Sequence, residues 1–243
     1  MNPGTTPRGT ASEQQAAEWV RGMFGNIAGR YDLLNHLLSF NLDRYWRRHT
    51  VDRVCSLIPP DARILDLCCG TGDLMLALER RRGASVLGAD FCHPMLVEAR
   101  RKAVAVRMCS QVFEADGLCL PLATASLDLV TVAFGFRNFV NYRRGLDEML
   151  RVLKPGGVAA ILEFSKPRNR LFGAVYNWFS TAVLPRIGGL ISGSPQAYSY
   201  LPESIRKFPD ADTLAGEMRG AGFSKVEFDA LTLGAVALHL GWK

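Results

Sequence analysis

The segment from Asp66 to Asp73 joins an apolar strand pattern to a turn with two glycines, and such a turn can hold a nucleotide-like cofactor. It reads Asp-Leu-Cys-Cys-Gly-Thr-Gly-Asp and follows Ile64 and Leu65. In a dinucleotide-binding G-x-G-x-x-G loop, the third glycine brings the helix close to the strand, and the helix N-terminus holds a pyrophosphate. Here that third position is Met75, and the Asp73 carboxylate in the first helical turn would repel a phosphate. The segment therefore favours a cofactor without phosphate.

S-adenosylmethionine meets this requirement, because it combines an adenosine, a sulfonium and an amino acid and carries no phosphate. The carboxylate of Asp66 can hold the ammonium group of this cofactor, while Gly70, Thr71 and Gly72 form the adjoining turn. The alternative is an ordinary strand-to-helix turn of a doubly wound domain, because two glycines at this spacing are a weak signal by themselves.

Acidic residues follow the next two expected strands. The strand at 84–89 ends at Asp90, about 20 residues after the first glycine, where a carboxylate can bind ribose hydroxyls. The strand at 111–115 ends at Asp116-Gly117, within reach of an adenine. A fourth strand spans 127–133, and ligands of open α/β sheets bind at the carboxyl ends of such strands. The expected cofactor contacts are Asp66, Gly70, Thr71, Gly72, Asp90, Phe91, Asp116, Gly117 and Ala133.

The composition indicates a folded protein with a basic surface. The chain has 243 residues, 48% of them hydrophobic, and a net charge of +6, which permits attraction to nucleic acid or to an anionic membrane. The six cysteines include no C-x-x-C pair, which favours a reduced, cytoplasmic setting, and no His/Cys spacing indicates a metal site. Residues 1–15 lack the apolar core of a signal peptide and are expected to form a disordered tail.

The remaining residues, 16–243, are expected to form a single α/β domain. Residues 16–60 have apolar positions at helical spacing and predict two or three helices before the first strand. Strands and helices then alternate, with a helix stop at 153–157 and a fifth strand at 158–164. Two short alternating runs follow near the C-terminus, at 225–231 and 235–240. This order predicts a doubly wound, mostly parallel, seven-stranded sheet closed by an antiparallel hairpin.

An insertion at 166–210 follows the fifth strand and is too long for an ordinary loop. It contains an apolar run from Leu171 to Leu184, which is too short to span a membrane and is followed by Pro185 and Arg186. Two interpretations stay open. The run forms either a core helix pair or an apolar lid over a greasy substrate, and such a lid could also touch a bilayer.

Candidate catalytic residues follow from the chemistry of a sulfonium methyl donor. Methyl transfer is an in-line displacement, so the protein must hold donor and acceptor together and make the acceptor electron-rich. Arg137 lies among aromatic residues directly after the fourth strand and could stabilise an oxyanion, although it could also form a salt bridge that fixes a loop. Tyr31, Asp32 and Glu163 are the candidate bases or orienting groups, and Asp32 could equally cap or pair on a helix surface.

From Phe24 to Lys243 the chain resembles the ubiquinone/menaquinone biosynthesis C-methyltransferases. The matching segments are Met23-Phe24, Tyr31-Asp32, Asn35, Ser39-Phe40, Leu65 to Leu67, Gly70 to Leu74, Phe134 to Asn138, Arg151 to Gly157, Leu162 to Pro167, Leu184 to Gly188, Tyr200 to Arg206 and Ala235 to His239. Two positions depart from the family pattern. Members often have serine where this chain has Ala133, and small apolar residues where it has Cys68-Cys69.

The resemblance implies a class I S-adenosylmethionine-dependent methyltransferase with a Rossmann-like fold, N-terminal helices and a helical insertion after the fifth strand. It implies methylation of a ring carbon of a polyprenylated quinol, converting demethylmenaquinol to menaquinol. The equivalent step on 2-methoxy-6-polyprenyl-1,4-benzoquinol in ubiquinone biosynthesis, or both steps, is the alternative. The resemblance also carries over the cofactor contacts Thr71, Asp90 and Asp116-Gly117, and it favours the lid interpretation of 166–210.

Three other functions fit the sequence less well. Amino-group methyltransferases acting on flipped bases carry an Asn/Asp-Pro-Pro-aromatic motif after the fourth strand, which is absent here, so no nucleic-acid partner is expected. Met75 and Asp73 disfavour a nucleotide-dependent oxidoreductase, and the retained carboxylates disfavour a silent quinone-binding module. We expect a cytoplasmic enzyme that can act at the inner face of the membrane. A homo-oligomer or association with partner enzymes stays open.

Overall fold

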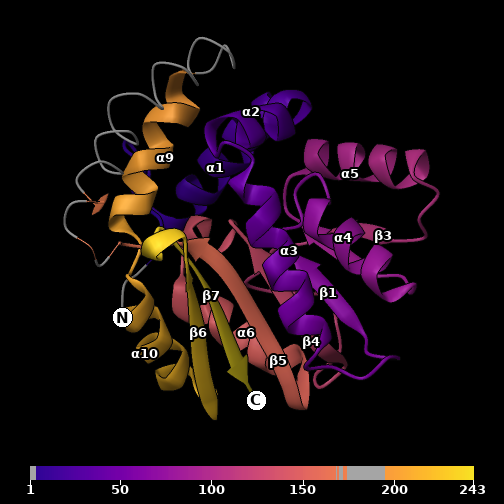
Figure 1. Ribbon diagram of the computed structural model, residues 1–243. Coiled ribbons are helices and arrows are strands. Elements are labelled where there is room, and N and C mark those ends of the chain that lie inside the picture. The colour runs from indigo at the N-terminus through magenta and orange to yellow at the C-terminus, as the bar shows by residue number, and fades with distance from the viewer. Residues whose placement is uncertain (1–3, 168, 170–171, 174–194) are drawn as a thin grey trace.

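The computed structural model describes residues 4–167, 169, 172–173 and 195–243. Within these ranges the strands form one sheet in the order β3-β2-β1-β4-β5-β7-β6. The strands are β1 (Ile64–Leu67), β2 (Leu87–Asp90), β3 (Gln111–Glu114), β4 (Leu127–Ala133), β5 (Leu153–Phe164), β6 (Lys225–Leu231) and β7 (Val236–Trp242). Strands β1 to β5 pair in parallel, whereas β7 is antiparallel to both β5 and β6. The predicted seven-stranded sheet with a closing hairpin is confirmed (Figure 1).

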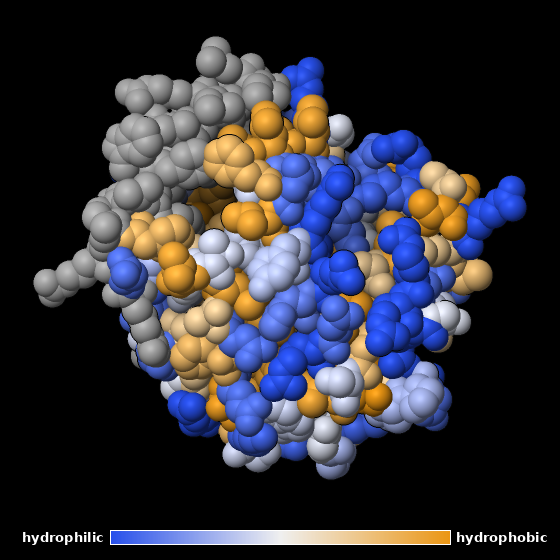
Figure 2. All heavy atoms as spheres, in the orientation of Figure 1, coloured by the Kyte–Doolittle hydropathy of each residue, from blue (hydrophilic) through white to orange (hydrophobic). Residues whose placement is uncertain are grey.

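Helices cover both faces of this sheet (Figure 1). The described helices are α1 (Glu13–Ile27), α2 (Tyr31–Leu38), α3 (Leu42–Cys55), α4 (Asp73–Arg82), α5 (His93–Ala105), α6 (Tyr142–Val152), α9 (Pro195–Lys207) and α10 (Ala211–Ala221), with short 3-10 turns η1 (Ala28–Arg30), η2 (Phe136–Asn138) and η4 (Thr232–Gly234). One hydrophobic core joins the sheet to α3, α4 and α5, and the other joins it to α6 and α10. The exposed sides of α3 and α4 are mainly hydrophilic (Figure 2).

The two cores follow from the side-chain alternation of the central strands. Along β4, Leu129 belongs to the first core and Val130 to the second, and along β5 Ala160 and Ile161 divide in the same way. Successive strand residues point to opposite faces, so a strand buried on both faces is apolar throughout. This pattern explains why the boundaries predicted for the fourth strand match β4.

Helix α4 approaches the sheet closely although Met75 replaces the third glycine of a dinucleotide loop. A Cβ atom on Gly88, in β2, would lie 2.6 Å from Met75 Sδ. The space that the absent glycine would leave on the helix is therefore supplied by a glycine on the strand. The α4 N-cap Gly72 has φ 86°, a left-handed conformation that glycine adopts without strain.

The N-terminal segment differs from the expected tail. Helix α1 begins at Glu13, where the Ser12 side chain accepts a hydrogen bond from Gln15 N. Farther towards the N-terminus, Thr5 is buried and its backbone N–H donates to Phe139 O at 2.7 Å. Thr5 therefore packs on the domain, through a hydrogen bond beside η2 that the sequence pattern alone does not reveal.

One further predicted boundary differs from the structure, and one segment can be compared with it only in part. The expected helix stop at 153–157 belongs to β5, which begins at Leu153 and pairs there with Leu127. In the insertion at 166–210, residues 168, 170–171 and 174–194 lie outside the described residues, and with them most of the apolar run. Among the described helices, none is long and apolar enough to cross a membrane.

Candidate active site

A pocket of about 840 Å³, including its open mouth, lies at the carboxyl ends of β1, β2, β3 and β4. It is lined by Ala17, Arg21, Phe24, Tyr31, Leu67, Cys68, Gly70, Asp90, Phe91, Met95, Ala115, Asp116, Gly117, Leu118, Ala133, Phe134, Gly135, Asn138, Phe139 and Val140. Seven of the residues expected at the site are in this lining: Tyr31, Gly70, Asp90, Phe91, Asp116, Gly117 and Ala133. They meet because parallel strands end at the same edge of the sheet.

Asp90 is the central carboxylate of the pocket. Its Oδ2 accepts a hydrogen bond from Gly70 N at 2.9 Å, and its Oδ1 accepts one from Cys92 N at 2.9 Å. These bonds fix the carboxylate at the end of β2 and tie it to the glycine turn. Burial raises the pKa of Asp90 to about 6, although the backbone donors act in the opposite direction.

Asp116 and Gly117 form the part of the wall that follows β3. The Asp116 carboxylate accepts a hydrogen bond from Leu118 N at 2.9 Å, which fixes the turn. A Cβ atom on Gly117 would lie 2.6 Å from Phe139 Cζ, so only glycine allows this ring to close against the turn. Phe91 lines the same pocket, and the Arg21 guanidinium lies 5.4 Å from its ring centroid. The pocket therefore combines two carboxylates with aromatic side chains.

The expected contacts Asp66, Thr71 and Gly72 are not part of the pocket lining. Asp66 is buried behind the turn, where its Oδ1 accepts a hydrogen bond from Thr131 Oγ1 at 2.8 Å. Burial raises the pKa of Asp66 to about 7. Gly72 caps α4 and Thr71 faces α2, so all three residues support the turn from behind.

Asp32, a candidate catalytic group, joins α2 to the glycine turn and does not line the pocket. Its Oδ1 accepts a hydrogen bond from Thr71 Oγ1 at 2.5 Å, and its Oδ2 lies 2.8 Å from Lys102 Nζ. Lys102, on α5, also pairs with Asp73. The carboxylate expected to repel phosphate is thus already neutralised by Lys102, which no local sequence pattern places beside it.

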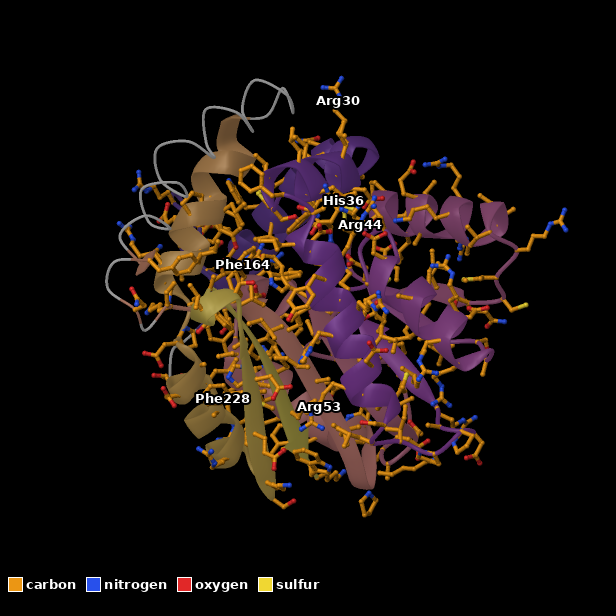
Figure 3. All side chains as sticks on the ribbon, viewed as in Figure 1. Arg30, His36, Arg44, Arg53, Phe164 and Phe228 are labelled. Atoms are coloured by element: carbon orange, nitrogen blue, oxygen red, sulfur yellow. The ribbon has the colours of Figure 1, made fainter. Side chains whose placement is uncertain are left out.

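Arg137 forms a buried ion pair with Glu163, at the end of β5. Its Nη1 lies 2.9 Å from Glu163 Oε1 and also donates to Phe134 O, whereas its Nε has no hydrogen-bond partner among the described residues. The guanidinium lies 5.3 Å from the ring centroid of Phe164, which Figure 3 labels at the end of β5. Of the two interpretations of Arg137, the structure has the ion pair that fixes a loop.

The positive charge of Arg137 still acts on the pocket through Tyr31. Burial raises the pKa of Tyr31, while Arg137 is the strongest influence that lowers it. Tyr31 is therefore a neutral phenol at neutral pH, able to donate a hydrogen bond but not to act as a phenolate base.

Asn138 is a polar residue of the pocket wall that the sequence analysis did not single out. Its Oδ1 accepts a hydrogen bond from Tyr200 OH at 3.0 Å, and this hydroxyl lies 2.8 Å from Thr5 Oγ1. The N-terminal segment, α9 and the pocket wall therefore meet at Tyr200. Asn138 could have been found from the sequence, because it directly follows Arg137. No local sequence pattern indicated that Thr5 would reach this wall.

Cys68 lines the pocket in a left-handed backbone conformation, with φ 55°. A Cβ atom on Gly135 would lie 2.4 Å from Cys68 Cβ, so the two strand ends touch at this point. Burial, helped by the charges of Asp90 and Asp66, raises the pKa of the Cys68 thiol well above its usual value. The thiol stays protonated and is a poor nucleophile towards an electrophilic methyl group.

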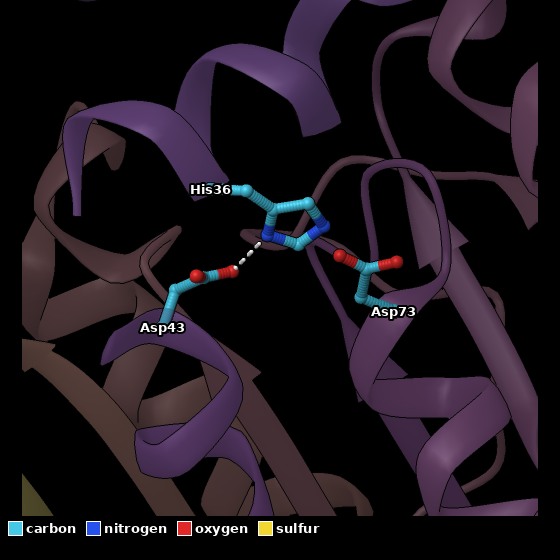
Figure 4. A group of neighbouring side chains, drawn as sticks. All are labelled: His36, Asp43 and Asp73. Atoms are coloured by element: carbon cyan, nitrogen blue, oxygen red, sulfur yellow. Dashed lines mark hydrogen bonds and ion pairs between the residues drawn. The ribbon is translucent and has the colours of Figure 1, made fainter. Parts of the chain in front are cut away.

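His36, Asp43 and Asp73 form a second polar group, in which the imidazole lies between the two carboxylates (Figure 4). His36 Nδ1 is 2.8 Å from Asp43 Oδ2. Arg47 pairs with Asp43. Burial alone would raise the pKa of Asp73, but the positive charges of Arg47 and Lys102 outweigh burial and lower this pKa below its usual value. Because two cations already neutralise the carboxylates, the group has the character of an ion-pair network, and we assign it no metal.

Two solved structures share this fold. The chain superimposes on an S-adenosylmethionine-dependent methyltransferase from Thermotoga maritima with a TM-score of 0.61 and 18% identity, covering 91% of this chain and 99% of that one. It also superimposes on the [4+2]-cyclase SpnF with a TM-score of 0.65 and 16% identity, covering 99% and 98%. These similarities establish the fold alone, because one fold can host unrelated reactions.

The sequence relatives are more specific. Residues 10–243 match the model of the ubiE/COQ5 methyltransferase family, and the chain belongs to this family. It is 52% identical to a demethylmenaquinone methyltransferase from Thermus thermophilus, covering 90% of this chain and 99% of the relative. Identity is 40% to a ubiquinone/menaquinone biosynthesis C-methyltransferase from Idiomarina loihiensis, with 96% and 93% covered. The family resemblance and the S-adenosylmethionine dependence expected from the sequence are confirmed.

Proposed function

We propose that this protein transfers the methyl group of S-adenosylmethionine to a ring carbon of a polyprenylated quinol, converting demethylmenaquinol to menaquinol. The observation that carries the proposal is the 52% identity to a demethylmenaquinone methyltransferase over 90% of this chain. The matched part of the chain also contains the pocket at the carboxyl ends of the strands, which is where open α/β sheets bind a nucleoside-like cofactor.

The polar groups of the pocket suit S-adenosylmethionine. Asp90 presents a fixed carboxylate that can accept hydrogen bonds from ribose hydroxyls. Asp116, Gly117 and Phe91 offer a polar edge and an aromatic surface for an adenine. Carboxylates also favour the positive sulfonium over an anionic ligand. Asp66 and Thr71 contribute in this proposal by shaping the turn from behind.

The described residues can also prepare the quinol. S-adenosylmethionine, when bound, would supply an electrophilic methyl group to the ring carbon and would leave as the neutral thioether S-adenosylhomocysteine, and the ring carbon would lose its hydrogen as a proton to water. Tyr31 can donate a hydrogen bond to a quinol oxygen, because its hydroxyl stays protonated. Arg137 provides a buried positive charge that favours the quinolate, and Glu163 holds it in place. Asn138 lines the wall beside them and can orient the ring.

An assay with methyl-labelled S-adenosylmethionine tests this function. The purified protein would be given a short-chain demethylnaphthoquinol or a 2-methoxy-6-prenyl-benzoquinol, with Asp90→Ala as the negative control. We expect label in the naphthoquinol ring. Label in the benzoquinol alone would favour the ubiquinone step, which the relatives at 40% identity also support, and label in both would indicate dual function. No transfer to either acceptor would overturn the proposal.

The substrate sets the expected location. A polyprenyl chain partitions into lipid, so we propose that the enzyme acts from the cytoplasm at the inner face of the membrane. Besides the quinol, contact with lipid, with a second copy of the chain or with other quinone-biosynthesis enzymes is compatible with this setting. Recognition of nucleic acid has no role in it.

A further inference from the structure

The side-chain amide of Asn138 has one end occupied and the other end free. Its Oδ1 accepts a hydrogen bond from Tyr200 OH at 3.0 Å, whereas its Nδ2 has no hydrogen-bond partner among the residues that the structure describes. Asn138 is 9% exposed, and it lines the pocket. A largely buried N–H group without a partner costs stability, so groups of this kind normally find one. The NH2 group of Asn138 is therefore available to a molecule in the pocket.

The charges of the pocket lining favour this orientation of the amide. The lining contains two carboxylates, of Asp90 and Asp116, and one guanidinium, of Arg21. The guanidinium is held over the Phe91 ring, 5.4 Å from its centroid. A side-chain amide orients in the field of its surroundings, and its NH2 group is the positive end of its dipole. The NH2 end consequently faces the more negative side of the pocket wall.

The side chain of Tyr200 is fixed by its surroundings. Tyr200 is 6% exposed, and its ring centroid lies 5.1 Å from that of Trp19, on α1, which lies beside α9 (Figure 1). Burial raises the pKa of Tyr200, so the hydroxyl keeps its proton at neutral pH. Its single O–H group is donated to Asn138. The other side of the hydroxyl oxygen is left to accept a hydrogen bond.

Thr5 supplies the donor for that oxygen. Its Oγ1 lies 2.8 Å from Tyr200 OH, and Thr5 is 6% exposed. Because the proton of Tyr200 is given to Asn138, the hydrogen bond between the two hydroxyls has Thr5 as its donor. The chain of hydrogen bonds thus runs from Thr5 through Tyr200 to Asn138, and it ends at the pocket.

The N-terminal segment holds Thr5 in this position from both sides. A Cβ atom on Gly4 would lie 2.2 Å from Val140 O, so the backbone runs directly against the pocket wall. On the other side, Lys207 Nζ, on α9, donates to Thr6 O at 3.1 Å. Thr5 is therefore fixed between the pocket wall and α9.

We propose that Tyr200 and Thr5 are positioning residues that fix the amide of Asn138 with its NH2 group towards the pocket, where it donates to an oxygen of the quinol ring. This inference rests on the proposed function, because the quinol supplies the acceptor oxygen. A hydrogen bond from an amide is stronger to a quinolate oxygen than to a neutral hydroxyl. The fixed NH2 group therefore favours the ionised ring that attacks the methyl group, whereas the reversed amide would favour the neutral quinol.

A double-mutant cycle between Tyr200 and Asn138 tests this positioning. Tyr200→Phe, Asn138→Ala and the double variant are assayed with a short-chain demethylnaphthoquinol. We expect each single variant to lower kcat/KM for the quinol about tenfold, and the double variant to fall no further, because Tyr200 acts through Asn138. Cofactor affinity, measured by calorimetry, should change by less than about twofold. The matched control is Tyr45→Phe, which removes a hydroxyl from a side chain that is 54% exposed on α3 and should behave like the intact chain.

Thr5 provides a second test that leaves the tyrosine in place. Thr5→Val keeps the shape of the side chain and removes its donor, so we expect kcat/KM to fall about threefold. Thr5→Ser keeps the hydroxyl and should restore kcat/KM to nearly the value of the intact chain. An equal loss in Thr5→Val and Thr5→Ser would overturn the role of this hydroxyl.

Two further results would overturn the role of Tyr200, namely additive losses in the double variant or an unchanged kcat/KM in Tyr200→Phe. Failure of the proposed function is distinguishable from failure of the positioning. A protein that transfers no methyl group can still be titrated with the demethylnaphthoquinol in the presence of S-adenosylhomocysteine. The same non-additive pattern in the dissociation constant would keep the positioning and reject only the reaction, and no quinol binding would overturn both.

Discussion

The Arg137 guanidinium and the Glu163 carboxylate form an ion pair beside the pocket, with Nη1 and Oε1 2.9 Å apart and both side chains almost fully buried. Removing one partner of such a pair leaves an uncompensated buried charge. We predict that Arg137→Ala lowers the free energy of unfolding by about 3–5 kcal/mol. Denaturant titration measures this change.

The double variant Arg137→Met/Glu163→Met separates stability from chemistry. Replacing both charges with apolar side chains should restore most of the lost stability, since a buried pair contributes little more than well-packed apolar groups. If Arg137 also favours the quinolate, turnover should stay low in the refolded double variant while the cofactor affinity is near normal. Recovery of turnover along with stability would restrict Arg137 to holding the loop.

The Asp90 carboxylate is expected to make stability and cofactor affinity depend on pH in opposite directions. Burial raises its pKa from 3.8 to about 6 in the folded protein. Between about pH 4 and pH 6 the folded state therefore binds more protons than the unfolded state, and this residue's contribution to stability falls as the pH rises through that window.

Cofactor affinity should change in the other direction, because hydrogen bonds from ribose hydroxyls are stronger to an ionised carboxylate. We predict that S-adenosylmethionine binding strengthens as the pH rises through about 6. Asp90→Asn should remove this step and weaken binding by about 10- to 100-fold at neutral pH. Calorimetric titrations across the pH range measure both effects, with the exposed Asp147→Asn on α6 as the control. An unchanged pH profile in Asp90→Asn would exclude the ribose role.

The Asp32 network predicts how this candidate catalytic residue behaves. Because Asp32 accepts from Thr71 and pairs with Lys102, Asp32→Ala should loosen the glycine turn. Cofactor affinity and stability should then fall together, the latter by about 1–3 kcal/mol. Lys102→Met should reproduce the loss of affinity although it lies outside the pocket lining. A selective loss of turnover in Asp32→Ala, with normal affinity and with no effect of Lys102→Met, would instead make Asp32 a catalytic group.

The contact between Met75 and Gly88 predicts a compensating pair. Gly88→Ala would place a Cβ atom 2.6 Å from Met75 Sδ, and such overpacking costs about 1–3 kcal/mol. Adding Met75→Ala makes room on the helix, so the double variant should be less destabilised than the sum of the two single variants, Gly88→Ala and Met75→Ala, as denaturant titration of all three can measure. Additive destabilisation would show that Met75 does not set the distance between α4 and β2.

The sequence was sufficient for the part of the site that depends on topology. Asp90, Asp116 and Gly117 reach the pocket because each follows a parallel strand, and all parallel strands end at one edge of the sheet. The apolar run of β4 and the alternating pattern of β6 likewise gave correct boundaries.

The hydrogen-bond and ion-pair partners of the site residues could not be predicted from the sequence in the same way. Asp66 and Arg137 have partners 65 and 26 residues away, in Thr131 and Glu163, and Asp32 meets Lys102 70 residues away. Such contacts form only when the elements pack, so a local pattern cannot reveal whether a charged residue faces the pocket or supports it. The same limit applies to Thr5, which reaches Tyr200 across 195 residues.

The most direct test of the central claim is a calorimetric titration of the purified protein with S-adenosylmethionine. We predict saturable binding that S-adenosylhomocysteine displaces, that Asp90→Ala weakens and that Asp147→Asn leaves unchanged. No binding heat at any temperature tried, or binding that Asp90→Ala does not alter, would contradict a cofactor site at the ends of these strands.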